Sequence, residues 1–316
     1  MGQAKSESKK QVFARLGWVL ILSQLITLGV VWGAEQIYRL YLGIRAPELD
    51  YVSLVRLLRS NGWSLMLGAI AGVLPCLKLR LTPRTSQLTG YLTRTRKSIS
   101  FSMVFVYVLL VMGLQNMASL LTLPMEAAAN SMGWSFLDAY TSAASMSDTL
   151  SLFLYTVLVA PFCEELIYRG FVLRALAPYG KIFGMVVAAL LFGLMHGNII
   201  QFPSALLCGF LFGYVTLEYS LPASMLIHAL NNLAAEAISW LQSTDEVTAA
   251  AVNQAVFSFG LVALLLYVTK FWRSFVRYFR ANRTEKGTLW HFVTTLPILL
   301  LLIYLVLLTG LSITPI

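Results

Sequence analysis

Ionisable and amide side chains occur inside strongly apolar stretches of the chain, where such groups are uncommon. Between residues 149 and 240 the candidates for a site are Glu164, Glu165, Arg169, His196, His228 and Asn232. The chain has only three histidines, and two of them follow the double glutamate in such stretches. Because a charged or strongly polar side chain is costly in a hydrocarbon environment, this pattern predicts a functional site.

The spacing of these residues divides their roles. Residues four apart share one face of an α-helix, so Glu165 and Arg169 are expected to pair and to stabilise the architecture. Glu164 points about 100° away from Glu165 and is free to face a cavity as a general base. His228 and Asn232 are also four apart, and Asn231 is the rival of Asn232 for the amide role.

A carboxylate, two imidazoles and an amide can hydrolyse a peptide bond without a covalent intermediate. A carboxylate and an imidazole can deprotonate a water and return the proton to the leaving nitrogen. An amide and a second imidazole can donate hydrogen bonds to the developing oxyanion. The predicted catalytic residues are therefore Glu164, His196, His228 and Asn232, with Glu165 and Arg169 in support.

Other chemistries use some of the same residues. Two histidines and a glutamate could hold zinc, although the sequence lacks the His-Glu-x-x-His helix of many zinc proteases. Cys163 could act as a nucleophile, but it precedes Glu164 on another helical face. There is no Gly-x-Ser-x-Gly motif. We expect a reaction without metal or cofactor.

Apolar helices must position these residues. The chain of 316 residues is 58% hydrophobic and 12% charged, which is typical of membrane proteins. Apolar runs long enough to cross a hydrocarbon core of about 30 Å recur throughout. They predict an all-α polytopic bundle of eight or nine transmembrane spans: about 16–38, 60–77, 100–123, 149–173, 182–200, 203–218, 222–240, 252–270 and 288–309.

The charges of the connections predict an orientation in the cell membrane. Most of the 23 Lys and Arg residues fall on one side: before the first run, in 78–97, at Arg169, Arg174 and Lys181, and in 270–286. The connections 124–148 and 241–251 contain no Lys or Arg. Because cytoplasmic loops are enriched in basic residues, we expect a cytoplasmic N-terminus and an external C-terminus. The net charge of +9 then needs no nucleic-acid partner.

Three regions follow from this division. Residues 1–148 form N-terminal transmembrane helices and a lid-like segment, 149–240 a catalytic core, and 241–316 C-terminal transmembrane helices. The segment 35–59 is interrupted by Pro47 and is expected to be an interfacial helix. The segment 124–148 is too polar to span and too apolar for a free loop, so it predicts a lid or re-entrant element.

Three motifs in this order resemble the CPBP family, the CAAX proteases and bacteriocin-processing enzymes also called Abi proteins. They are Glu-Glu-x-x-x-Arg at 164–169, Phe-x-x-x-His at 192–196 and His-x-x-x-Asn at 228–232, and the resemblance covers about 161–232. It implies an all-helical intramembrane glutamic peptidase without metal. Carried over, Glu164 and His196 activate the water, His228 and Asn232 form the oxyanion side, and Glu165 and Arg169 support them.

The expected function is an endopeptidase that cleaves a peptide or membrane protein presented in the bilayer, with access from the cytoplasmic half. Two other classes stay open at this point. One is a non-catalytic immunity or scaffold protein that keeps the fold and binds a peptide. The other is a transporter that uses the buried glutamate and histidines as a proton relay, although the chain shows no repeated halves.

Overall fold

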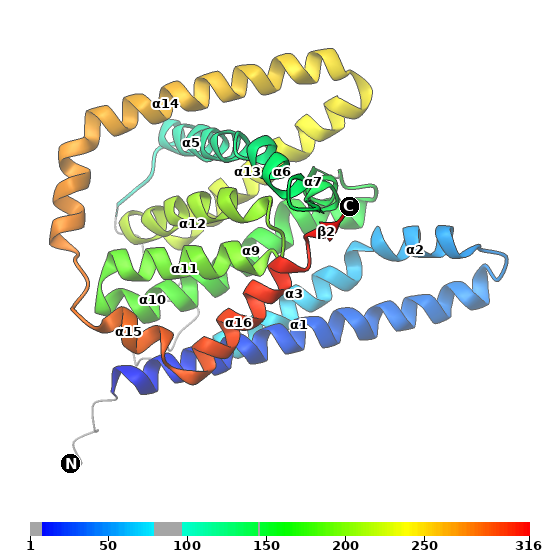
Figure 1. Cartoon of the computed structure of the whole chain (residues 1–316), viewed down its shortest axis with the longest axis horizontal. Helices are drawn as coiled ribbons and strands as arrows, with labels where there is room; N and C mark the ends of the chain where they lie inside the picture. The colour runs from blue at the N-terminus through cyan, green and yellow to red at the C-terminus, as the bar shows by residue number, and fades with distance from the viewer. Residues whose placement is uncertain (1–7, 79–96, 145) are drawn as a thin grey trace.

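The N-terminal helices form one antiparallel pair. The computed structural model describes residues 8–78, 97–144 and 146–316. In it α1 (Lys9–Arg45) runs along α3 (Gly62–Lys78), and the short α2 (Tyr51–Arg59) joins them (Figure 1). Ser23 of α1 donates a hydrogen bond to the Gly72 carbonyl at 2.6 Å, because the missing side chain of Gly72 lets the backbones approach. The predicted interfacial segment 35–59 is thus the end of α1 plus α2.

One long helical rod, Leu150–Tyr179, carries the double glutamate. Its α-helical parts are α8 (Leu150–Leu154), α9 (Ala160–Glu165) and α10 (Arg174–Leu176). Two wide π-helical parts, η2 (Tyr155–Val159) and η3 (Leu166–Leu173), interrupt them, and the 3₁₀ turn η4 (Ala177–Tyr179) ends the rod. The predicted span 149–173 falls almost entirely within this rod, but the rod continues to Tyr179 and is not a uniform α-helix.

Three further helices surround the rod and build the core with it. They are α11 (Lys181–Met195), α12 (Gln201–Glu218) and α13 (Leu221–Thr244). Fully buried side chains of the rod, such as Val172, Leu173 and Leu176, pack against Met185 and Leu191 of α11. This packing fixes the two helices that carry the first two motifs.

The remaining long helices close the bundle. In α5 (Phe101–Ser119) and α14 (Glu246–Ala281) two glycines meet, so that a Cβ on Gly113 would lie 2.7 Å from the Gly260 backbone. Residues 270–281 were predicted to be part of a basic connection, but they are helical and belong to α14. α14 bends in its C-terminal part (Figure 1). The other predicted basic connection, 78–97, lies almost wholly outside the described residues.

The last predicted span is divided in two. The structure has α15 (Thr288–Val293) and α16 (Leu296–Gly310) instead of one helix over 288–309. Pro297 explains the break, because proline has no N–H for the carbonyl of Val293, four residues earlier.

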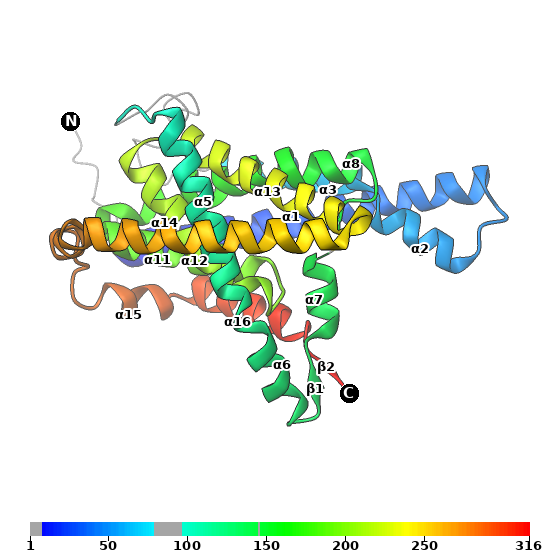
Figure 2. The same ribbon diagram turned by 90° about the horizontal axis from the view of Figure 1, so that it is seen from above.

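The predicted lid or re-entrant segment is a helical hairpin that projects from the other helices (Figure 2). It consists of α6 (Thr122–Asn130), β1 (Trp134–Ser135) and α7 (Leu137–Ala144). β1 pairs antiparallel with β2 (Thr314–Pro315), a small exception to the all-α prediction. The Asn198 amide donates to the Ala139 carbonyl at 2.9 Å, which joins the hairpin to the connection between α11 and α12.

The structure supports a multi-pass membrane protein. Four described helices are long and apolar enough to cross a membrane: Lys9–Arg45, Phe101–Asn130, Leu150–Tyr179 and Glu246–Ala281. A fifth is possible if α2 and α3, inclined by 41°, cross as one unit. The count of eight or nine spans and the orientation of the termini stay predictions.

Candidate active site

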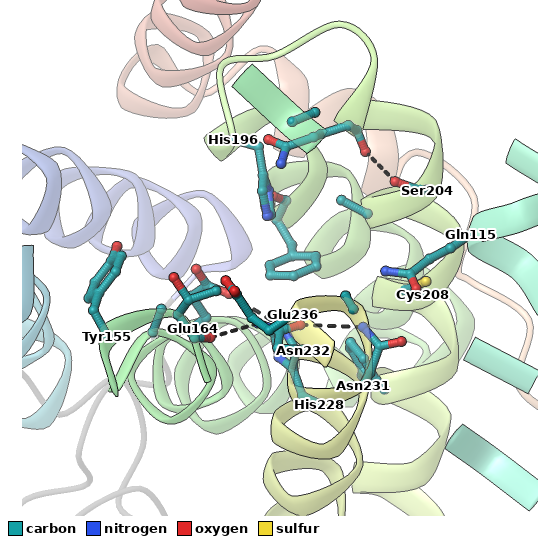
Figure 3. Close-up of a pocket in the computed structure, with 18 of the residues that line it drawn as sticks. Gln115, Tyr155, Glu164, His196, Ser204, Cys208, His228, Asn231, Asn232 and Glu236 are labelled. Atoms are coloured by element: carbon teal, nitrogen blue, oxygen red, sulfur yellow. Dashed lines mark hydrogen bonds and ion pairs between the residues drawn. The ribbon is translucent and has the colours of Figure 1, made fainter. Parts of the chain in front are cut away.

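A cavity of about 380 Å³ opens between the rod and helices α11, α12 and α13. All four residues predicted to be catalytic line it: Glu164, His196, His228 and Asn232. In Figure 3, His196 lies across the cavity from Glu164 and His228. The three motifs, which are more than 60 residues apart in sequence at their extremes, are therefore brought together by the fold.

Glu165 and Arg169 form the predicted ion pair. Arg169 Nη1 lies 2.8 Å from Glu165 Oε1, and both side chains are fully buried. Arg169 Nη2 also donates to the Gly209 carbonyl at 3.1 Å, and its guanidinium lies over the Phe192 ring at 4.3 Å. The charge of Glu165 is thus neutralised within the core, as a buried carboxylate requires.

Glu165 also orients His228, and this contact between the two residues was not predicted from the sequence. His228 Nδ1 lies 3.1 Å from Glu165 Oε1, and the Ser224 hydroxyl donates to Glu165 Oε2 at 2.6 Å. The Phe212 ring stacks on the imidazole at 4.7 Å. Ser224 and His228 are four residues apart on α13, so the spacing in the sequence carried a signal for their shared face.

Glu164 occupies the opposite side of the same imidazole. Its Oε2 lies 3.8 Å from His228 Nε2, and its side chain keeps 19% of its exposure. No Lys or Arg lies within 4.0 Å of it among the described residues. The two neighbouring glutamates therefore differ as the spacing predicted: Glu165 is neutralised in the core, and Glu164 faces the cavity.

His196 stands at a helix end, not within a span. The predicted helix 182–200 stops at Met195, and His196 is the C-terminal cap of α11. Gly197 adopts φ +57°, a left-handed conformation that glycine accepts and that ends the helix. His196 Nδ1 lies 2.8 Å from the Phe192 carbonyl, so Nε2 is the nitrogen left for the cavity.

Asn232 is fixed by a carbonyl that the π-helical turn releases. The Ala160 N–H bonds to the Tyr155 carbonyl, and Pro161 has no N–H to offer the next carbonyl, that of Thr156. Asn232 Nδ2 donates to this carbonyl at 2.9 Å, while its Oδ1 accepts from Asn231 at 3.3 Å. One N–H of the Asn232 amide remains available.

Further polar residues line the cavity, among them Glu236, which was not predicted to lie in the site, and Asn231. Glu236 is one helical turn beyond Asn232, and both its carboxylate oxygens accept hydrogen bonds from Ser147, at 2.6 and 3.2 Å. Asn231, the predicted rival of Asn232, is only 2% exposed, and its Oδ1 has no hydrogen-bond partner among the described residues. Glu236 lies four residues after Asn232, an interval that places both residues on one face of a helix and that could have predicted its position.

Within the described parts of the chain, no group of three or more His, Cys, Asp and Glu side chains has the arrangement of a metal site. Cys163 is buried beside Glu164 and does not line the cavity, whereas Cys208 does.

Comparison with known proteins gives one family. Residues 146–234 match the family of type II CAAX prenyl endopeptidase Rce1-like proteins. No curated protein and no solved structure gave a significant match. The matched segment contains the rod and all three motifs, and it ends before Glu236. The chain is therefore a multi-pass membrane protein, and its segment 146–234, which carries the three motifs, is similar to the CAAX prenyl endopeptidases.

Proposed function

We propose that this protein is a glutamic-type membrane endopeptidase in which Glu164 is the general base. Glu164 takes a proton from a water molecule, and the resulting hydroxide adds to the carbonyl carbon of the scissile peptide bond. When the carbon–nitrogen bond breaks, a proton passes to the leaving nitrogen. The products are a carboxylate and an amine, and no covalent enzyme intermediate is formed.

The other cavity residues have complementary roles. The oxyanion is stabilised by hydrogen bonds from His228 Nε2 and from the free N–H of Asn232, which lie one turn apart on α13. In this role His228 is the imidazolium, with a proton on each ring nitrogen. Nδ1 donates to Glu165, whose negative charge stabilises that form, and Nε2, which points toward Glu164, donates to the oxyanion. His196, across the cavity, assists proton transfer between the water and the leaving group.

The main support is the contrast between the two glutamates. Glu165 is fully buried against Arg169, whereas Glu164 has no such partner and faces the cavity 3.8 Å from His228. A purely structural pair of acids would not need one carboxylate left without a cation in a partly buried site.

The substrate is a peptide or a membrane-protein segment presented at the bilayer, and access is from the cytoplasmic half. The name of the matched family raises a prenylated C-terminal tail as one substrate to test. The proposed orientation rests on the basic segment 270–286, because basic residues are enriched on the cytoplasmic side of membrane proteins.

Hydrolysis of a fluorogenic peptide library by the detergent-purified protein tests the mechanism. The comparison includes wild type, Glu164→Gln, His196→Ala and His228→Ala, each with and without a zinc chelator. We expect chelator-resistant hydrolysis that falls about 100-fold or more in Glu164→Gln. Unchanged hydrolysis in Glu164→Gln would refute the general-base role. Loss of wild-type activity with the chelator, restored by added zinc, would replace the mechanism with a metal-dependent one.

A further inference from the structure

The polar face of α13 continues beyond the proposed catalytic residues. His228, Asn232 and Glu236 follow one another at intervals of four residues and all line the cavity. From His228 to Glu236 the helix rises about 12 Å. Figure 3 shows Glu236 beside Asn232, on the same side of the cavity. The cavity therefore extends from the proposed reaction centre to a second carboxylate.

Glu236 is buried without a cation. Its residue is 9% exposed, and the described residues include no Lys, Arg or His within 4.0 Å of its carboxylate. Ser147 donates two hydrogen bonds to this carboxylate, one from its backbone N–H and one from its hydroxyl. These bonds hold the carboxylate in place but do not neutralise its charge. A carboxylate has about four acceptor positions, so roughly half of them remain for a ligand. Glu165, by contrast, is neutralised by Arg169.

The rest of the lining favours a ligand that donates hydrogen bonds. Among the described residues that line the cavity there is no Lys or Arg, and two carboxylates, Glu164 and Glu236, are present. Asn231 lines the same cavity and brings no positive charge to it.

We propose that Glu236 forms a subsite for a positively charged side chain of the substrate, Lys or Arg, close to the scissile bond. An extended peptide advances about 3.3 Å per residue, so a distance of about 12 Å places this side chain within roughly four residues of the bond that is cleaved. An acidic side chain or a terminal carboxylate at that position is repelled by Glu236. This inference rests on the proposed function and adds the class of substrate.

A positional peptide set tests the subsite. One Lys is moved from four residues before to four residues after the scissile bond of an otherwise uncharged fluorogenic peptide. Wild type is compared with Glu236→Gln, Glu236→Lys and the exposed control Glu246→Gln. We expect Lys at one position to raise kcat/KM about tenfold or more in wild type and Glu246→Gln, the effect of one charged hydrogen bond. Glu236→Gln loses this preference, and Glu236→Lys prefers Glu at the same position.

Binding separates a failure of the subsite from a failure of the proposed chemistry. Fluorescence anisotropy of the same peptides on Glu164→Gln, with and without Glu236→Gln, reads the charge preference without hydrolysis. A Lys preference in binding that disappears with Glu236→Gln supports the subsite even if wild type hydrolyses none of the peptides. No charge preference in either assay, or the same preference in Glu236→Gln, overturns it.

Discussion

Glu165 Oε1 lies 2.8 Å from Arg169 Nη1 and 3.1 Å from His228 Nδ1, so one carboxylate oxygen joins the ion pair of the rod to the imidazole of α13. The residue expected to serve only the architecture thereby determines how a predicted catalytic residue is oriented. Substitutions of the two adjacent glutamates should consequently fail in different ways.

Glu165→Gln should destabilise the protein as well as inactivate it. The substitution leaves the Arg169 guanidinium fully buried without a counter-charge, and breaking a buried pair costs about 3–5 kcal/mol. Glu164→Gln, which removes no such pair, should lose activity while the thermal unfolding midpoint in detergent stays near wild type. Equal midpoints for the two variants would contradict the division of roles.

Ser224→Ala should weaken the support of Glu165 without removing its charge. The Ser224 hydroxyl donates to Glu165 Oε2 at 2.6 Å in a fully buried place, and the unpaired acceptor costs about 1–3 kcal/mol. We expect a lower unfolding midpoint and a lower kcat. Ser204→Ala is the matched control, because Ser204 also lines the cavity but donates its hydrogen bond to the Gln201 carbonyl of its own helix.

Pro161→Ala should compete with Asn232 for the Thr156 carbonyl. Alanine supplies the N–H that Pro161 lacks, so the carbonyl can be satisfied within the rod and no longer needs the amide of α13. We expect kcat to fall because Asn232 loses its anchor. The stability cost of Asn232→Ala should be smaller in the Pro161→Ala background, as a double-mutant cycle measures. Additive costs would show that the two groups do not share this carbonyl.

The stability of the protein should depend on pH through Asp245, which lies outside the membrane-spanning helices. It caps the start of α14, and the hydrogen bonds from the Thr248 side chain and backbone hold the pKa of Asp245 below its usual range. Because the folded-state pKa is lowered, the contribution is present above the unfolded-state pKa and disappears as pH falls through the folded-state pKa. The difference in unfolding midpoint between wild type and Asp245→Ala should therefore be constant near neutrality and shrink below about pH 4. A difference that grows on acidification would contradict this capping role.

The apolar runs predicted most of the helices, because a long apolar segment in a membrane satisfies its backbone hydrogen bonds by forming a helix. The three motifs and their spacing likewise predicted the Glu165–Arg169 pair and the cavity-facing Glu164. The position of His196 was wrong because Ile199 and Ile200 extend the apolar run past Gly197, and only the left-handed backbone of that glycine ends the helix.

Other parts of the site depend on tertiary contacts. The contact of Glu165 with His228 exists because α9 packs against α13, which no local spacing encodes. The π-helical turns were also not predicted, since they require the Thr156 carbonyl to find its partner on another helix. Glu236 was not predicted because it lies beyond the last motif, four residues after Asn232.

Because the rod contains π-helical turns, the direction in which its site residues point depends on the exact number of residues in those turns. A π-helical turn holds one residue more than an α-helical turn, so the residues after η2 are rotated by about 100° relative to a continuous α-helix. Thr156 can thus face α13 while Glu164 faces the cavity, from one unbroken rod. Deleting a single residue between 155 and 159 would turn the whole of the Glu-Glu-x-x-x-Arg motif away from its partners. A change in phase of this kind displaces several side chains at once, which no single substitution in the rod does.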